Sequence, residues 1–202
     1  MIQEAVLKTL DYYADNADEF ATQTQKVDFS EIRNKFIEKL PAKGVVLDFG
    51  CGAGRDTKAF VEVGLMVEAW DGSPELCSIA SRYAGIQVKH HLFNELSERE
   101  KYDGIWACAS ILHLPLAELK DVLRRIVVAL KCGGIFYTSF KYGNFEGQRN
   151  GRYFTDMTAE SLAALLEEYN ELEIIDEWQT GDVRVGRENE QWLNIIMRKN
   201  NI

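Results

Sequence analysis

Apolar residues change their spacing along the chain at about residue 44. Residues 1–40 contain two stretches in which apolar side chains recur every three or four positions, as in helices with one buried face. From residue 44 to residue 140, short aliphatic runs alternate with helical stretches. Strands that alternate with helices are typical of an α/β protein built on a parallel sheet.

The last third of the chain predicts elements that complete such a sheet. A strand over 134–140 is followed by a polar, glycine-containing loop over 141–154 and by a helix that begins at Thr158. Residues 172–178 and 192–197 alternate in polarity as strands do. We therefore expect one domain over 1–202, with a helical cap (1–40), a core (44–140) and a tail of loop and strands (141–202).

The stretch Val45–Gly54 combines a buried strand with a glycine-rich turn. Its aliphatic run ends near Asp48, and Gly50, Gly52 and Gly54 follow at alternate positions. Such a turn leaves its backbone amides open to a ligand, because glycine accepts positive φ and carries no Cβ. The dinucleotide-binding fingerprint G-x-G-x-x-G, counted from Gly50, would place its third glycine at residue 55. In this chain the third glycine stands one position earlier, at residue 54.

A second carboxylate stands at the end of the next predicted strand, over 65–70. Asp71 follows the glycines by about 20 residues, where doubly wound nucleotide-binding folds place the acid that accepts both ribose hydroxyls. Its alternative role is to begin the next helix. Ser73 followed by Pro74 already supplies that helix with an N-cap and a first turn, which leaves Asp71 for the ribose.

Four stretches resemble motifs of the class I S-adenosylmethionine-dependent methyltransferases, in the same order. Residues 48–54 resemble [DE]-x-G-x-G-x-G, residue 71 is the acid of the second motif, residues 102–115 resemble the fourth motif, and residues 130–136 resemble the "LKPGG" turn that closes a helix. The resemblance implies a Rossmann-like α/β fold. Its seven-stranded, mostly parallel sheet would carry helices on both faces and end in a C-terminal antiparallel hairpin.

The resemblance also implies S-adenosylmethionine as cofactor and a set of residues that contact it. That set is Tyr13, Asp48, Gly50, Cys51, Gly52, Asp71, Gly72, Ser73, Phe93, Ala107 and Cys108. Two positions depart from the family pattern. Leu92 stands where the family often has an acid for the adenine amino group, and Cys132 replaces a proline.

Acceptor specificity is expected in the segments outside the core, because loops at the carboxyl ends of the strands carry function in open α/β sheets. The candidate segments are 12–20, 139–154 and 182–194, which resemble small-molecule methyltransferases akin to those of tellurite resistance. We expect acceptor contacts from Tyr12, Tyr142, Arg149, Arg152, Tyr153 and Arg187. His113 is the candidate general base, and a structural hydrogen-bonding role is the alternative.

Composition narrows the class of acceptor and the environment. A net charge of −9 without a basic stripe disfavours nucleic acid. Four scattered cysteines favour reduced thiols and the cytoplasm, and neither a metal site, a secretory signal nor a membrane span is expected. We expect a monomer or weak homodimer that methylates a small molecule. The alternatives are a tRNA or protein methyltransferase, or a module that binds the cofactor without turnover.

Overall fold

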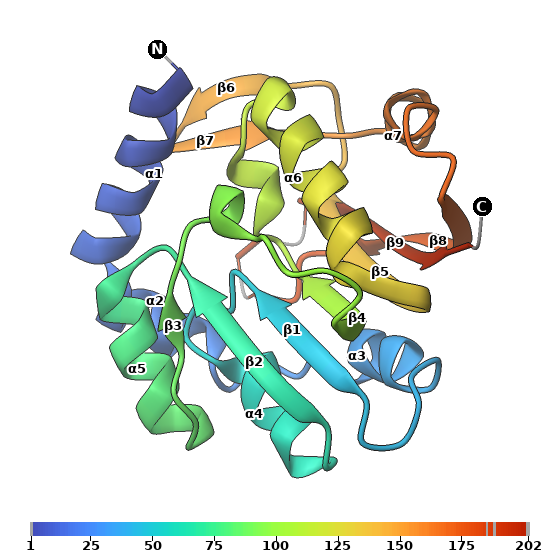
Figure 1. The fold of residues 1–202 in the computed structure, drawn as a ribbon. Coiled ribbons are helices and arrows are strands. Elements are labelled where there is room, and N and C mark those ends of the chain that lie inside the picture. The colour runs from blue at the N-terminus through green and yellow to red at the C-terminus, as the bar shows by residue number, and fades with distance from the viewer. Residues whose placement is uncertain (1, 185, 188, 201–202) are drawn as a thin grey trace.

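A computed structural model describes residues 2–184, 186–187 and 189–200. Its centre is a seven-stranded sheet in the order β3-β2-β1-β4-β5-β9-β8 (Figure 1). Strands β1 to β5 pair in parallel, and β9 is antiparallel to both of its neighbours, β5 and β8. The strands of this sheet are β1 (Val45–Phe49), β2 (Met66–Asp71), β3 (Lys89–His90), β4 (Tyr102–Ala107), β5 (Leu130–Lys141), β8 (Leu172–Gly181) and β9 (Gln191–Lys199).

Helices connect and cover these strands. They are α1 (Ile2–Asp15), α2 (Ala17–Thr24), α3 (Ser30–Ile37), α4 (Arg55–Glu62), α5 (Pro74–Ala84), α6 (Leu116–Ala129) and α7 (Ala159–Leu166), with 3₁₀ turns at Phe93–Glu95 and Ile111–His113. No helix among the described residues is long and apolar enough to cross a membrane. The predicted fold class is confirmed: a Rossmann-like, mostly parallel seven-stranded sheet that ends in an antiparallel hairpin.

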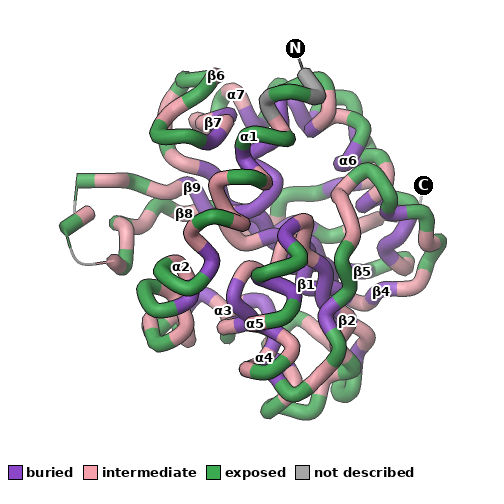
Figure 2. Tube along the Cα trace, turned by 90° about the vertical axis from the view of Figure 1, so that its left-hand side faces the viewer, coloured by how far each residue is buried: buried purple, intermediate pink, exposed green. Residues whose placement is uncertain are grey.

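Neighbouring residues of each central strand belong to different hydrophobic layers, because side chains alternate between the two faces of a sheet. Val46 packs with Phe36 of α3 and Phe60 of α4 on one face. Leu47 belongs to the layer on the other face, which includes Leu123 of α6 and residues of α7. Figure 2 shows the central strands as largely buried, beneath helices whose outer sides are exposed. Helices therefore cover both faces, as predicted.

The segment predicted as a loop over 141–154 is instead mostly a hairpin. Strands β6 (Glu146–Arg149) and β7 (Arg152–Thr155) form a separate two-stranded sheet. The hairpin lies beside α1 (Figure 1), and the Tyr153 backbone N–H donates to Thr9 Oγ1 at 2.9 Å. Each strand has only four residues, too few for an alternating pattern to be read from the sequence.

Two further sequence expectations are corrected by the backbone. The N-terminal 40 residues form three helices and not two, because the chain turns at Asn16 and α2 follows α1 at once. The glycine pair at 133–134 does not close α6, which ends at Ala129 with Leu130 already extended. Gly133, at φ 74°, lies within β5, where the pairing with β4 shifts register.

Candidate functional site

A cavity of about 400 Å³ lies at the carboxyl ends of the parallel strands. Its wall is drawn from α1, from the loops after β1, β2 and β4, from β7, and from the β8–β9 connection. This is the edge at which ligands bind in open α/β sheets. The volume falls within the range of about 300–1,000 Å³ that is usual for small-molecule sites.

The glycine-rich turn brings backbone close to this cavity. Gly50 and Gly52 adopt φ values of 81° and 55° and line the wall. The backbone amides of Gly50 and Cys51 both donate to the Trp70 carbonyl at 2.9 Å, and the amide of Gly52 donates to Asp71. The expectation that these amides stay open to a ligand is therefore wrong. What the turn offers a ligand is close approach to Cα atoms that carry no side chain.

Asp71 joins the glycine turn to the start of α5. One carboxylate oxygen accepts the Gly52 amide at 2.8 Å, and the other accepts the Ser73 amide at 2.9 Å. Burial raises the pKa of Asp71 to about 6, against the opposing effect of these hydrogen bonds. Each oxygen keeps a further acceptor position. Asp71 lines the cavity, so this capacity is available to a ligand with hydroxyl groups.

Asp48 lies deeper, with only 2% of its surface exposed. One of its oxygens accepts the hydroxyl of Thr57 at 2.6 Å. Burial, followed by the nearby Asp56 carboxylate, raises the pKa of Asp48 to about 8. A cation placed beside it would favour the ionised form again. Asp48 and Asp71 give one side of the cavity its acidic character.

His113 is fixed by both of its ring nitrogens. Nδ1 lies 2.7 Å from the Tyr153 carbonyl oxygen and must donate, since a carbonyl only accepts. Burial, with the cations Arg152 and Lys141 nearby, lowers the pKa of His113 to about 3. The ring is therefore neutral, and Nε2 accepts the hydroxyl of Tyr13 at 2.8 Å. This arrangement leaves His113 without a free nitrogen for an acceptor.

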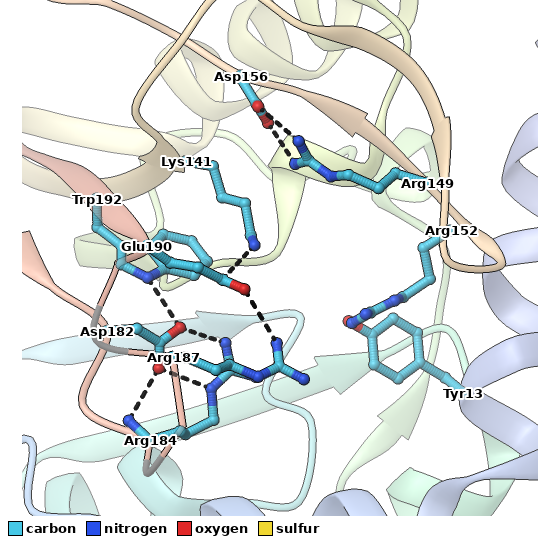
Figure 3. A network of polar contacts seen from close by, with 10 residues as sticks. All are labelled: Tyr13, Lys141, Arg149, Arg152, Asp156, Asp182, Arg184, Arg187, Glu190 and Trp192. Carbon is cyan, nitrogen blue, oxygen red and sulfur yellow. Dashed lines mark hydrogen bonds and ion pairs between the residues drawn. The ribbon is translucent and has the colours of Figure 1, made fainter.

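Basic side chains also line the cavity, and most of them come from the end of β5 and the β8–β9 connection. Lys141 pairs with Glu190, Arg187 lies 3.9 Å from the same carboxylate, and Arg184 pairs with Asp182. Figure 3 shows these pairs beside Trp192, whose indole N–H donates to Asp182 at 3.1 Å. Arg152 lines the cavity from β7 and is 8% exposed, and its Nη1 lies 3.5 Å from the Tyr13 oxygen.

The structure brings many of the predicted site residues to one cavity. Those on its wall are Tyr13, Asp48, Gly50, Cys51, Gly52, Asp71, Gly72, Phe93, Cys108, His113, Arg152 and Arg187. The sequence placed them correctly relative to one another because strand ends and their loops share one edge of a parallel sheet.

The remaining predicted cofactor residues, Ser73 and Ala107, do not line the cavity. Ser73 caps α5 by accepting the Leu76 amide at 3.3 Å, and Ala107 is fully buried within the sheet. Each is next to a residue that does reach the wall, Gly72 and Cys108. Ser73 and Ala107 therefore lie just behind the wall, and whether they contact the cofactor stays a prediction.

The remaining predicted acceptor residues also lie outside the wall. Arg149 pairs with the buried Asp156 through two contacts of 3.0 and 3.1 Å. Tyr142 is 39% exposed, and the Tyr153 hydroxyl donates to Glu146 at 3.1 Å. Tyr12 supports the guanidinium of Arg152, whose central carbon lies 4.4 Å from the ring centroid. Tyr12, Arg149 and Tyr153 thus make contacts in and around the hairpin, Tyr142 faces solvent, and none of the four lines the cavity.

Several wall residues were not named individually as site residues by reasoning from the sequence, although most lie in the candidate segments or at the adenine position. They include Phe20, Phe29, Leu92, Asn94, Ser139, Lys141, Asp182, Arg184, Trp192 and Asn194. Their positions depend on how α2, the β8–β9 connection and the end of β5 meet in three dimensions. Leu92 and Phe93 carried a local signal, because they follow the third strand of the predicted fold. Trp192 and Asn194 carried none beyond membership of a candidate segment.

Comparison with known proteins agrees with this architecture. A family model described as a methyltransferase domain matches residues 46–134. A comparison with curated protein sequences gave no significant match. Among solved structures, the 1,6-didemethyltoxoflavin-N1-methyltransferase of Burkholderia thailandensis, with 1,6-didemethyltoxoflavin and S-adenosylhomocysteine bound, is similar with a TM-score of 0.76 and 25% identity. The alignment covers 98% of this chain and 89% of that one.

Two further structures share the fold at lower identity. The N-methyltransferase NodS of Bradyrhizobium japonicum, solved with S-adenosylhomocysteine, has a TM-score of 0.71 and 16% identity, with coverage of 93% of this chain and 98% of that one. The [4+2]-cyclase SpnF has a TM-score of 0.67 and 17% identity, with coverage of 85% and 80%. Together with the strand order, the domain match and these structures support the assignment of the chain to the class I S-adenosylmethionine-dependent methyltransferases.

Proposed function

We propose that the protein transfers the methyl group of S-adenosylmethionine to a small-molecule acceptor. The observation that carries this proposal is that one cavity is lined by the acids Asp48 and Asp71 and also by the basic and aromatic side chains of Arg152 and Tyr13. S-adenosylmethionine, when bound, supplies an electrophilic methyl group on a positively charged sulfur. The acids suit a cationic cofactor, and the basic and aromatic side chains suit a separate acceptor in the same cavity.

The residues present fit this cofactor. The free acceptor positions of Asp71 match a ribose diol, and the glycine turn at Gly52 has no side chain where the cofactor would approach. Leu92 and Phe93 offer apolar wall for the adenine ring, although no side-chain acid stands there to accept its amino group. Asp48 would face the ammonium group, which would restore its ionised form.

Tyr13 and His113 act together as a fixed wall of the site. The Tyr13 hydroxyl donates its hydrogen to His113 Nε2. The phenol oxygen is therefore left as an acceptor, and Arg152 donates to it. The predicted role of His113 as a direct general base is not favoured by this geometry. We propose instead that His113 is a positioning residue for Tyr13. Alignment of acceptor and methyl group then supplies much of the rate.

Several features support a small acceptor over RNA or protein. The net charge of −9 opposes a polyanion, and the basic side chains at the cavity are largely paired with acids. The Burkholderia enzyme that is 25% identical binds a small molecule in its structure.

We further propose that residues 1–202 act as one unit, since the cap, core and tail all contribute to one cavity. The four free cysteines support a location in a reducing compartment such as the cytoplasm. That the protein is a monomer or weak homodimer stays a prediction.

Structural similarity to a [4+2]-cyclase favours one alternative, a protein that uses this fold for a reaction other than methyl transfer. Isothermal titration with S-adenosylmethionine and S-adenosylhomocysteine tests the cofactor. We expect one site with a Kd on the order of 1 µM. Incubation of a cell metabolite extract with methyl-labelled S-adenosylmethionine then tests the reaction.

The proposed function predicts label in a low-molecular-weight product with the wild type and much less with Asp71→Asn. Label that enters bulk tRNA stoichiometrically, and in a salt-sensitive way, would contradict a small-molecule acceptor. Cofactor binding without any labelled product from extracts would favour the module that binds without turnover.

A further inference from the structure

Arg152 is a buried cation that lacks a carboxylate partner. It is 8% exposed, and among the described residues no carboxylate oxygen lies within 4.0 Å of its guanidinium. Its Nε atom is buried and has no hydrogen-bond partner. In Figure 3, Arg149, Arg184 and Arg187 each lie against an acid, whereas Arg152 lies beside Tyr13 and next to no acid that is drawn. Burying a charge is unfavourable unless it is paired, so the Arg152 guanidinium favours an anion beside it.

The surroundings of Arg152 hold its guanidinium in one plane. Its central carbon lies 4.4 Å from the centroid of the Tyr12 ring and 5.2 Å from that of Phe154. Stacking of this kind is favourable for arginine and occupies the faces of the guanidinium, which leaves its N–H edges for hydrogen bonds. Because Arg152 lies on the cavity wall, an oxyanion in the cavity could accept from those edges.

Two further cations lie near His113 together with Arg152. The cations that lower the pKa of His113 are Arg152, Lys141 and Arg149, and they face it from β7, β5 and β6. Arg149 and Lys141 are each neutralised by an acid, which leaves Arg152 as the cation without compensation within this described group. The acidic side of the cavity lies at Asp48 and Asp71.

From this geometry we propose that the methyl acceptor is a small organic anion whose delocalised, oxygen-bearing group pairs with Arg152. The inference rests on the proposed function and specifies its substrate class. Arg152 would stabilise the ionised form of the acceptor and hold it at the β7 part of the cavity wall. Apolar wall from Phe154, Trp192 and Leu112 would contact the rest of the acceptor.

An ionised acceptor also accounts for a site in which His113 has no free nitrogen. A lone pair of the anion forms the bond to the methyl carbon, and the electron pair of the carbon–sulfur bond stays on sulfur. The negative charge of the acceptor and the positive charge of the sulfonium disappear together. No proton has to leave the acceptor during the transfer, so no general base is required.

The competing assignment is that Arg152 pairs with the carboxylate of the cofactor itself. The test separates the two by using S-adenosylhomocysteine to fill the cofactor site and formate as the probe anion, since formate is small enough for any acceptor cavity. Formamide serves as the neutral control of the same shape. The readout is the nuclear magnetic resonance signal of the Arg152 Nε–H, identified by its loss in Arg152→Gln.

The proposal predicts that formate shifts the Arg152 signal saturably in the protein loaded with S-adenosylhomocysteine, with a Kd on the order of 10 mM. Formamide should leave the signal unchanged. Formate should also raise the melting temperature of the wild type and of Arg124→Gln, but not of Arg152→Gln. Arg124 is a matched control, because its side chain is 60% exposed on α6. Arg152→Lys should keep part of the effect and covers the case in which the glutamine variant does not fold.

Two results would overturn the proposal. In one, formate does not move the Arg152 signal, or formamide moves it equally. In the other, S-adenosylhomocysteine alone moves the Arg152 signal and abolishes its response to formate. In that case Arg152→Gln also weakens the binding of S-adenosylhomocysteine but not that of 5′-methylthioadenosine, which lacks the amino-acid carboxylate. Failure of the proposed function is distinguishable from both, because it would appear either as no binding heat for S-adenosylhomocysteine in the wild type or as cofactor binding without any labelled small-molecule product from extracts.

Discussion

Replacement of Asp71 by asparagine should weaken the cofactor complex through the ribose. In the free protein the two carboxylate oxygens each accept one backbone amide, from Gly52 and from Ser73. Hydrogen bonds to a charged group contribute about 1.5–3 kcal/mol each, and an amide retains only one acceptor oxygen. With two ribose hydroxyls to bind, we expect a loss of about 3 kcal/mol, or roughly 150-fold in Kd.

Calorimetry with S-adenosylhomocysteine and its 2′-deoxy analogue isolates this contact. Removal of the 2′-hydroxyl should weaken binding to the wild type but should weaken binding to Asp71→Asn much less, because the partner is already gone. Circular dichroism serves as the control for folding, since the variant also loses an acceptor for a backbone amide. A folded Asp71→Asn protein with unchanged affinity, or an equal penalty for the deoxy analogue in both proteins, would refute the ribose assignment.

The raised pKa of Asp71 adds a dependence on pH to the same contact. The carboxyl titrates near pH 6 in the free protein, and ribose hydroxyls donate to its ionised form. Affinity for S-adenosylhomocysteine should therefore fall as pH drops below about 6, by up to about tenfold per pH unit. Asp71→Asn should show no such fall in that window. A wild-type affinity that is flat between pH 7 and 5 would contradict an ionised Asp71 at the ribose.

The remaining predictions concern the turn and the Tyr13–His113 pair. Gly52→Val should lower cofactor affinity more than 100-fold, whereas Gly64→Val, equally strained but in open space, should not; similar losses in both would contradict this. The wild type should lose stability as pH falls from 6.5 toward 3, because His113 is protonated in the unfolded chain and stays neutral in the folded chain. The free energy of unfolding of His113→Gln should depend less on pH in this range. Tyr13→Phe should lower the free energy of unfolding by about 1–3 kcal/mol, through an unsatisfied Nε2, and equal stability would contradict the hydrogen bond.

The core of the fold could be predicted because its signals are local. A buried strand, a glycine turn and an acid at the next strand end lie within residues 45–71, and parallel topology brings those ends together. Asp71 was placed correctly in the cavity for this reason. The sequence did not show that the turn's own amides are satisfied by Trp70 and Asp71, because this depends on the register of β1 against β2.

The acceptor side could be predicted only as a set of segments. Arg149 and Arg152 look equivalent in the sequence, yet the hairpin places them directly opposite each other as a pair. Asp156 neutralises Arg149, while Arg152 turns to Tyr12 and the cavity. Which arginine stays unpaired is fixed by the register of β6 and β7 and by their packing on α1. Neither this register nor this packing can be read from the sequence, because β6 and β7 have only four residues each and are too short to show an alternating pattern.

A crystal structure with S-adenosylhomocysteine bound tests the central claim most directly. The account predicts ribose hydroxyls within hydrogen-bond distance of Asp71, and the thioether sulfur facing free volume bounded by Tyr13 and Arg152. That volume is where the acceptor would meet the methyl group. A cavity that stays empty at saturating S-adenosylhomocysteine, or a sulfur enclosed by protein atoms with no space beside it, would contradict methyl transfer at this site.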